Sequence, residues 1–130
     1  AEGDAQVLFE TDDKVERSRM QMQVEIALFR IAQEAVKNAS VHGRATEIKV
    51  RLTCSDGNVT LLVEDNGAGF KPEKVAGAGL GITSMRERTE ALGGTLTIRS
   101  QPGRTAVEAS IPADLFEPIT PETPEADEAE

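Results

Sequence analysis

Apolar residues recur along the chain with two different periods, and each period predicts its own kind of element. Over residues 17–40 they return every three or four positions, which is typical of a helix with one buried face; these residues are Met20, Val24, Leu28, Ile31 and Ala35. At Ile48, Val50 and Leu52 they alternate with polar residues, and residues 59–63 form a more continuous apolar run. Both of these patterns indicate β-strands.

Turn-forming residues separate these elements and complete their order. His42-Gly43 is expected to end the first helix, because glycine is the usual residue just beyond a helix C-terminus. The sequence Ser-Asp-Gly-Asn at 55–58 favours a hairpin turn. In chain order the expected elements are a short strand over 6–10, a helix over 17–40, a hairpin over 48–63, a loop over 66–79, a helix over 80–92 and a hairpin over 95–111. This order predicts an α+β fold, a two-layer sandwich with both helices on one face of a mixed, mainly antiparallel sheet.

The negative charge of the chain is concentrated near its end. The net charge of the 130 residues is −9, with 23 acidic residues against 14 basic ones, but seven of the acids lie after residue 112, where Lys and Arg are absent. The remaining 16 acids nearly balance the 14 bases, so the body lacks the basic excess of a nucleic-acid-binding protein. A Pro- and acid-rich segment with few apolar residues cannot offset the entropy of ordering. We therefore expect one domain over residues 1–112 and a disordered tail over 113–130.

Cysteine and long apolar runs are scarce. The one cysteine, Cys54, excludes an internal disulfide framework and is expected to be a small apolar filler near a strand end, in a protein of a reducing compartment. No run approaches the ~18 apolar residues of a membrane span, and no signal peptide is recognisable. We expect a cytoplasmic domain without direct membrane contact, which can still belong to a membrane-bound receptor.

An acidic residue and two glycines follow the more apolar strand. Asp65 comes directly after Val63-Glu64, so it is expected where a buried strand emerges, and a carboxylate there can accept a hydrogen bond from the amino group of a purine. Gly67 and Gly69 permit positive φ and let the backbone approach a flat ligand. Taken alone, Asp-Asn-Gly also fits a plain turn.

A second glycine-rich run stands directly before the second helix. Gly79 and Gly81 would lie beside the unpaired amides of the first helical turn, and such amides bind phosphate. The run resembles a dinucleotide-binding fingerprint only loosely, because Ile82 stands where the last glycine of that fingerprint would be. A flexible loop leading into an ordinary helix is the alternative interpretation.

Three polar residues follow one another along the first helix. Glu34 and Asn38 lie four positions apart on one face, and His42 extends the row by one turn. The Asn38 amide oxygen can ligate Mg²⁺, and the Glu34 carboxylate can accept a proton from a nucleophile. A solvent-exposed helix edge in which Arg30 pairs with Glu34 is the alternative. His42 does not make a zinc site; at a helix end it is better suited to contact a phosphate or the helix dipole than to be a phosphoacceptor.

Taken together in this order, the motifs resemble those of the GHKL (Bergerat-fold) ATPases. Residues 29–38, Phe-Arg-Ile-Ala-Gln-Glu-Ala-Val-Lys-Asn, are similar to the N box of that family, and residues 65–70 and 77–82 are similar to its two glycine boxes. The sequence Met-Arg-Glu-Arg at 85–88 and Pro-Gly-Arg-Thr at 102–105 resemble sensor histidine kinases of the NarX/DesK type. The resemblance covers about residues 6–112, and four ordered motifs at family-like spacing make it specific.

The resemblance implies binding of ATP and Mg²⁺, with the adenine near the first glycine box. Asp65 would bind the adenine amino group, directly and through a water molecule shared with Thr105. Gly67 and Gly69 would shape the adenine pocket.

The resemblance places the phosphates near the N box and the second glycine box. Asn38 would bind the Mg²⁺ that bridges the ATP phosphates, and Glu34 would orient or deprotonate the attacking imidazole. His42 is placed at the phosphate end of the helix. Residues 70–78 would form a short ATP lid, and the phosphates would be cradled by Gly79, Leu80 and Gly81.

The implied protein is an enzyme, a protein-histidine kinase: the catalytic domain of a two-component sensor kinase that transfers the γ-phosphoryl group of Mg-ATP to a histidine. That histidine would lie on a separate dimerising helical domain, which nothing before residue 20 supplies, and a response regulator would be an indirect partner. Two alternatives remain. An anti-sigma-factor-type serine kinase or stand-alone GHKL ATPase is disfavoured by the Met-Arg-Glu-Arg helix. An inactive nucleotide-binding module that docks a partner through the first helix is disfavoured by intact Glu34 and Asn38.

Overall fold

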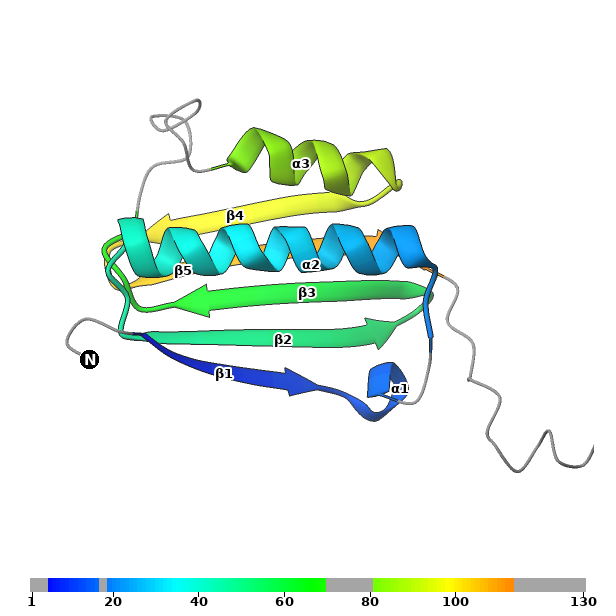
Figure 1. Ribbon diagram of the computed structural model, residues 1–130, viewed down its shortest axis with the longest axis horizontal. Helices are drawn as coiled ribbons and strands as arrows, with labels where there is room; N and C mark the ends of the chain where they lie inside the picture. Colours follow the sequence, from blue (N-terminus) through cyan, green and yellow to red (C-terminus); the bar gives the residue numbers. More distant parts are fainter. Residues whose placement is uncertain (1–4, 17–18, 70–80, 114–130) are drawn as a thin grey trace, which may run out of the picture.

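A five-stranded sheet forms one layer of the computed structural model, which describes residues 5–16, 19–69 and 81–113 (Figure 1). The strands are β1 (Gln6–Thr11), β2 (Glu47–Ser55), β3 (Asn58–Asp65), β4 (Thr95–Gln101) and β5 (Arg104–Pro112). Their order across the sheet is β1-β2-β3-β5-β4; β1 runs parallel to β2, and all other neighbours are antiparallel. The expected α+β fold with a mixed, mainly antiparallel sheet is confirmed.

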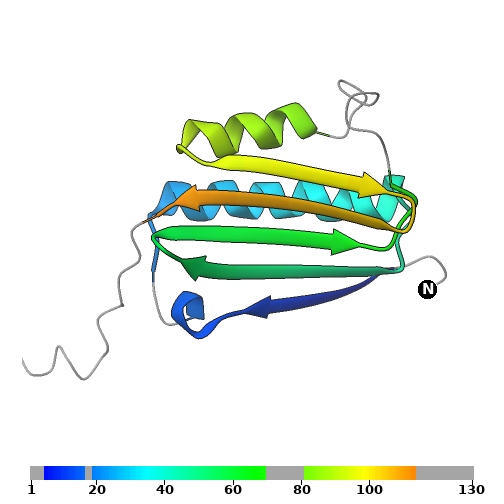
Figure 2. The same ribbon diagram turned by 180° about the vertical axis from the view of Figure 1, so that it is seen from behind.

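Two helices cover one face of this sheet and leave the other face open, as the two opposite views show (Figures 1 and 2). They are α2 (Met22–Lys37), which continues as a π-helical turn, η1 (Asn38–His42), and α3 (Ile82–Ala91). A further one-turn helix, α1 (Asp13–Glu16), follows β1 and was not expected from the sequence. Among the described residues no helix is long and apolar enough to cross a membrane.

The apolar stripes predicted from the two periods form the core between the layers. The stripe of α2 is buried through Val24, Leu28, Ile31 and Ala35. It packs on alternate residues of the strands, which include Ile48, Val50, Val59, Leu61, Val63, Val107, Ala109 and Ile111. From α3, Met85 and Thr89 are buried, and the Thr89 hydroxyl is satisfied because it donates to the Met85 carbonyl at 2.8 Å.

The boundaries of the first helix differ from the prediction at both ends. Residues 19–21 are not helical and α2 begins at Met22; Arg17 and Ser18 lie outside the described residues. Met20 packs against the core from this non-helical segment, so the apolar spacing that suggested a helix is met without one. At the other end Gly43 has φ −89°, and the left-handed conformation falls on Arg44 with φ 53°. Gly43 therefore ends the helical segment without a left-handed turn.

The predicted turns agree with the structure, and the second helix is confirmed but shorter than the predicted 80–92, since Gly81 and Leu92 flank α3 without being helical. Asp56 and Gly57 both have positive φ, 52° and 78°, which is the geometry that a two-residue hairpin turn requires. Cys54 lies partly buried near the end of β2 as a free thiol. The disordered tail predicted over 113–130 is wrong at its first residue, because Ala113 is buried and its N–H donates to the Gly57 carbonyl at 3.0 Å. Outside the described residues lie the predicted loop from residue 70 onward, Gly79, Leu80 and the rest of the predicted tail, from residue 114 onward.

Candidate nucleotide site

The end of α2 with its continuation η1, the end of β3 and the beginning of β5 meet at the left of Figure 1. Asp65 is the last residue of β3 and stands directly opposite Thr105 of β5. Asn38 begins the π-helical turn at the end of α2 and is only 5% exposed. These three side chains surround one small cavity of about 10 Å³, lined by Ala35, Asn38, Ala39, Gly43, Asp65, Gly69, Thr105 and Val107. The structure thus brings the predicted carboxylate, amide and hydroxyl together.

The Asp65 carboxylate is partly desolvated. Burial raises its pKa above the ordinary value, and the hydrogen bond from the Gly67 N–H to Asp65 Oδ1, at 2.8 Å, acts in the opposite direction. Thr105 is buried beside it, and its hydroxyl lies 2.7 Å from that of Ser100. Shifted carboxyl pKa values are common at binding sites, because burial that disfavours charge also strengthens any hydrogen bond that a ligand brings.

The loop after Asp65 approaches the end of α2 so closely that it needs glycine. A Cβ on Gly67 would lie 2.6 Å from the Gly43 carbonyl oxygen, and one on Gly69, which has φ 81°, would lie 2.7 Å from the Gln101 carbonyl oxygen. The Ala68 N–H donates to Gly43 at 2.9 Å, and the Gly103 N–H donates to Gly67 at 2.8 Å. The loop is therefore held between α2 and the β4–β5 turn, with its backbone facing the cavity.

The π-helical turn shapes the end of α2. The Gly43 N–H donates to the Asn38 carbonyl at 2.8 Å, one residue further than an α-helix would allow. Asn38 and Ala39 are both buried in this turn, whereas His42 is exposed at its end. The predicted row of Glu34, Asn38 and His42 therefore does not continue along one face. Such single π-turns are frequent at functional sites.

Glu34 lies against Gly81, the first described residue of the second glycine-rich run. Gly81 precedes α3 with φ 67°, and a Cβ there would lie 2.6 Å from Glu34 Cδ and 2.7 Å from Oε2. Glu34 is partly buried, and no ion pair joins it to Arg30 in the described part of the chain. The alternative in which Arg30 pairs with Glu34 is therefore absent from this structure. Gly79 and Leu80 lie outside the described residues.

The residues of the site suit a metal that arrives with a ligand. Within residues 5–16, 19–69 and 81–113 no group of three or more His, Cys, Asp or Glu side chains can hold an ion. Asn38 offers a single buried amide instead. Mg²⁺ is commonly held by one or two protein oxygens and completed by substrate phosphates and water, so the donor set fits a magnesium–nucleotide complex better than a free ion.

Three further residues of the site were not singled out from the sequence. Asn66 accepts from the N–H groups of Thr46 and Glu47 at 2.9 and 3.0 Å and fixes the loop before β2 to the end of β3. Ser100 pairs with Thr105, and the Gly43 carbonyl receives the glycine loop. Ser100 could have been found from the sequence, because it stands opposite Thr105 across the Pro-Gly turn of the predicted hairpin. The role of Gly43 could not, because it depends on Ala68, which is far away in the sequence.

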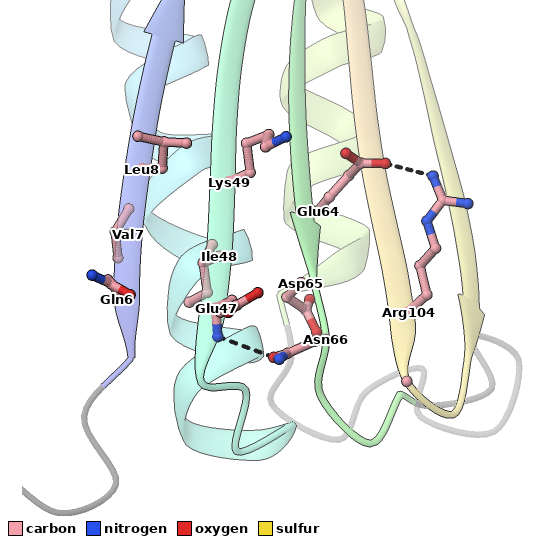
Figure 3. Close-up of a pocket in the computed structure, with 11 residues that line it drawn as sticks. Gln6, Val7, Leu8, Glu47, Ile48, Lys49, Glu64, Asp65, Asn66 and Arg104 are labelled. Carbon is pink, nitrogen blue, oxygen red and sulfur yellow. Dashed lines mark hydrogen bonds and ion pairs between the residues drawn. The ribbon is translucent and has the colours of Figure 1, made fainter.

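A wider groove of about 680 Å³ lies on the open face of the sheet (Figure 3). Its polar groups largely satisfy one another: Arg104 pairs with Glu64 at 2.5 Å, and Asn66 receives the Glu47 N–H. Helix α2 lies behind the sheet in this view. The groove shares Asp65 with the smaller cavity, but the buried Asn38 amide and the Gly69 backbone line the smaller cavity and not the groove.

Comparison with known proteins gives one family. A family model described as histidine kinase-, DNA gyrase B- and HSP90-like ATPase matches residues 23–115. The histidine-protein kinase/phosphatase DegS of Bacillus subtilis is 36% identical over 87% of the chain, and the nitrate/nitrite sensor NarQ of Escherichia coli is 46% identical over 68% of it. The chain covers only 30% and 16% of these two relatives.

Solved structures share the fold. A blue-light activated histidine kinase of Erythrobacter litoralis superposes with a TM-score of 0.69 at 22% identity, covering 83% of this chain and 35% of that one. The mycobacterial sensor histidine kinase MprB superposes with a TM-score of 0.61 at 23% identity, covering 82% of each chain. At these identities the likeness concerns the arrangement of helices and strands.

Proposed function

Because the chain belongs to the family of histidine kinase-, DNA gyrase B- and HSP90-like ATPases, we propose that it is the catalytic, ATP-binding domain of a sensor histidine kinase. It would bind Mg-ATP and transfer the γ-phosphoryl group to a histidine on a helical dimerisation domain elsewhere in the parent protein. The parent would work in the cytoplasm and pass the phosphoryl group on to a response regulator. The observation that carries the proposal is the meeting of Asp65, Thr105 and Asn38 around one cavity beside Gly67.

Asp65 is proposed to accept a hydrogen bond from the adenine amino group. Its carboxylate emerges at a strand end, is partly buried and is oriented by the Gly67 N–H at 2.8 Å. The cavity of about 10 Å³ beside Thr105 has about the room that one water molecule needs, which supports a water bridge between Thr105 and the base. Glycine at 67 and 69 lets the loop take this position, because a Cβ at either residue would strike a carbonyl oxygen of the protein, and the backbone of the loop is proposed to lie against the ring.

The phosphates are proposed to lie between the end of α2 and the beginning of α3. Asn38 would bind Mg²⁺, which when bound neutralises charge on the phosphate oxygens. Gly81 stands at the N-terminus of α3, where first-turn amides attract anions. His42, exposed at the end of η1, is proposed to contact a phosphate from the rim, and Gly79 and Leu80 are proposed to join Gly81 in the cradle.

Glu34 is proposed to act on the incoming histidine. An imidazole nitrogen would attack the γ-phosphorus in line, the bond to the β-γ bridging oxygen would break, and ADP would leave. Glu34 would accept or orient the proton on the other imidazole nitrogen, so that the neutral ring attacks. The contact between Glu34 and Gly81 supports this role because it holds the carboxylate beside the proposed phosphate cradle.

Nucleotide binding tests the first half of the proposal. We expect a fluorescent ATP analogue with Mg²⁺ to bind, and Asp65→Asn to weaken its binding about 10- to 150-fold, the equivalent of a lost hydrogen bond to a charged group. Asp12→Asn is the matched control, because it makes the same chemical change at the opposite end of the sheet. Equal affinity of both variants and the unaltered chain would refute the site.

Phosphoryl transfer tests the second half. The chain is mixed with a helical domain that carries a phosphoacceptor histidine and with γ-labelled ATP. Glu34→Gln is expected to keep nucleotide affinity and to lower the transfer rate about 10²- to 10⁴-fold. Label on a serine of an added protein, or release of free phosphate alone, would favour the serine-kinase or stand-alone ATPase alternatives.

A second candidate function is a nucleotide-binding module that docks a partner without transferring phosphate. It is favoured by the outer face of α2, where Met22, Ile26 and Phe29 are 72%, 49% and 62% exposed in one row. ATP binding without transfer to a competent acceptor, together with partner binding that Phe29→Lys abolishes, would select this candidate.

A further inference from the structure

The edge strand β1 is apolar on both of its faces and exposed. Val7, Leu8 and Phe9 are 50%, 53% and 61% exposed. Val7 and Phe9 stand beside Ile48 and Val50, whose side chains face the helices, but neither α2 nor α3 extends over β1 (Figure 1). Leu8 lies on the open face next to Lys49 (Figure 3). Natural proteins rarely leave such an edge unprotected.

The hydrogen-bonding direction of β1 follows from its two ends. The Gln6 N–H donates to the Thr46 carbonyl at 2.9 Å, and the Asp12 N–H donates to the Leu52 carbonyl at 3.3 Å. Backbone groups of successive residues in a strand point to opposite sides, so the even-numbered residues face β2. The N–H and C=O groups of Val7 and Phe9 therefore point away from the sheet, and no described element lies beyond them in either view (Figures 1 and 2).

The opposite edge of the sheet is protected. On β4 the side chains of Thr95, Thr97 and Arg99 are exposed and polar, and Arg86 of α3 donates to the Leu96 carbonyl at 2.9 Å. Polar or charged side chains and a covering helix are the usual devices against edge-to-edge pairing. On β1 the single charged residue is Glu10, and Arg51 neutralises it at 3.1 Å. The apolar edge is thus confined to β1.

We propose that β1 pairs in the antiparallel direction with β1 of a second copy of this chain, about a two-fold axis at Leu8. Antiparallel strands require outward-facing residues to stand opposite outward-facing residues. This register meets the requirement, because Val7 pairs with the partner's Phe9 and Leu8 faces the partner's Leu8. The alternative register about Phe9 also meets it, but it sets Leu8 against the charged Glu10.

The register about Leu8 is complementary in side chains as well. Val7 and Phe9 of the two copies form one apolar cluster on the helix side, and the two Leu8 side chains meet on the open face, in the closer type of cross-strand pair. Gln6 stands opposite Glu10, so no two like charges face each other. Asp65 and Thr105 lie on β3 and β5, away from this edge, so both nucleotide sites stay open in the pair. The proposal does not depend on the nucleotide function.

The experiment measures self-association of the 130-residue chain together with amide hydrogen exchange at each residue. A strand pair alone is smaller than the ~1,200–2,000 Å² of a stable interface, so we expect a weak dimer in sedimentation runs up to about 1 mM. Exchange of the Val7 and Phe9 amides is expected to slow as concentration rises, whereas the inward-facing Leu8 and Glu10 amides are protected at every concentration. Leu8→Lys, which sets two like charges opposite each other, is expected to weaken association at least tenfold.

Phe29→Lys is the matched control, because it places a lysine at a similarly exposed apolar position on α2, and it is expected to leave association unchanged. A chain that is monomeric at about 1 mM would overturn the proposal. So would a dimer that Phe29→Lys abolishes and Leu8→Lys does not, or Val7 and Phe9 amides whose exchange is independent of concentration. The exchange measurement needs no variant, so misfolding of either variant leaves the test intact.

Discussion

Asp12 and Asp65 stand at opposite ends of the same sheet, each just where a strand finishes, and their surroundings shift their pKa values in opposite directions. Asp12 accepts from the Cys54 N–H at 3.0 Å and from the Val15 N–H at 2.8 Å, and these bonds, that to Cys54 first, lower its pKa. Asp65 accepts from the Gly67 N–H, but burial dominates and raises its pKa. An ionised aspartate thus stabilises the fold at the Asp12 end of the sheet and lowers its stability at the Asp65 end.

Glycines show the same division between the two ends. At the far end a Cβ on Gly94 would lie 2.2 Å from the Ser110 carbonyl oxygen and 3.0 Å from Ile111 Cα, inside the packed core. At the site end a Cβ on Gly67 would meet the Gly43 carbonyl oxygen at the wall of the cavity. Both glycines are needed for close approach, but only the second approach borders a cavity. Stability and binding should therefore separate along the sheet.

The largest expected effect is a loss of stability from a substitution at Gly94, at the end of the sheet opposite the candidate site. Gly94→Ala should lower the free energy of unfolding by about 1–3 kcal/mol, because the added methyl group overpacks the core and the β5 backbone must shift. Urea denaturation followed by circular dichroism measures this change. ATP-analogue affinity, measured where the variant is folded, should stay within about twofold of the unaltered chain. A large loss of affinity would mean that the two ends are coupled.

Gly67→Ala should have the opposite pattern, a larger loss of nucleotide affinity and a smaller loss of stability. The methyl group would displace the loop between α2 and the β4–β5 turn, so nucleotide affinity should fall at least about tenfold, the equivalent of ~1.4 kcal/mol. The loop can yield more easily than β5, so the loss of stability should be smaller than for Gly94→Ala. Isothermal titration and denaturation of the same sample give both numbers. A stability loss without an affinity loss would contradict the assignment of this loop to the site.

Local patterns in the sequence predicted most of this architecture. Alternation located β2 and β3, and Asp56-Gly57 located their turn, because both depend on a few neighbouring residues. The helical stripe placed the core of α2 but not its start, since Met20 reaches the core from a non-helical segment. The spacing of apolar residues indicates which side chains are buried. It does not determine whether the residue at the end of the pattern has a helical backbone.

Features that depend on contacts between residues far apart in the sequence could not be predicted from local patterns. The π-helical turn exposes His42 rather than aligning it with Glu34, and the Gly43 carbonyl of that turn bonds Ala68, which no local signal encodes. The site residues were predicted from motif order, and the structure brings Asn38, Asp65 and Thr105 to one cavity. Their roles toward ATP remain predictions that the variants above test.

Asp12 should contribute stability at neutral pH. Its folded-state pKa is lowered, so its contribution is fully present above the ordinary pKa of about 3.9 and is lost as pH falls through the folded value. Asp12→Ala removes the acceptor for the Cys54 and Val15 N–H groups and should cost about 0.5–2 kcal/mol at pH 7, as for other residues that cap a helix. Melting at pH 7 and at pH 3 should show the gap between variant and parent narrowing at the lower pH. A constant gap would assign the effect to packing.

The smallest expected effect has the opposite sign and lies at the site end. Because the folded-state pKa of Asp65 is raised, the folded chain holds a proton more tightly than the unfolded one, and stability is lost as pH rises from about 3.9 through the folded value. Asp65→Asn removes the partly buried charge and keeps an oxygen for the Gly67 N–H. The variant should therefore be more stable than the parent at pH 7, by less than about 1 kcal/mol because water screens the exposed part of the carboxylate.

The same Asp65→Asn change is expected to weaken nucleotide binding, so one substitution should raise stability and lower affinity. Well below the ordinary pKa of about 3.9 the parent carboxylate is protonated in both the folded and the unfolded state, and the stability gain should vanish. Melting curves of parent and variant across pH 3–8 give the gain, and titration with the ATP analogue gives the loss. If Asp65→Asn destabilised the chain at pH 7, the carboxylate would be a structural acceptor like Asp12, and the two ends of the sheet would not differ in the way proposed.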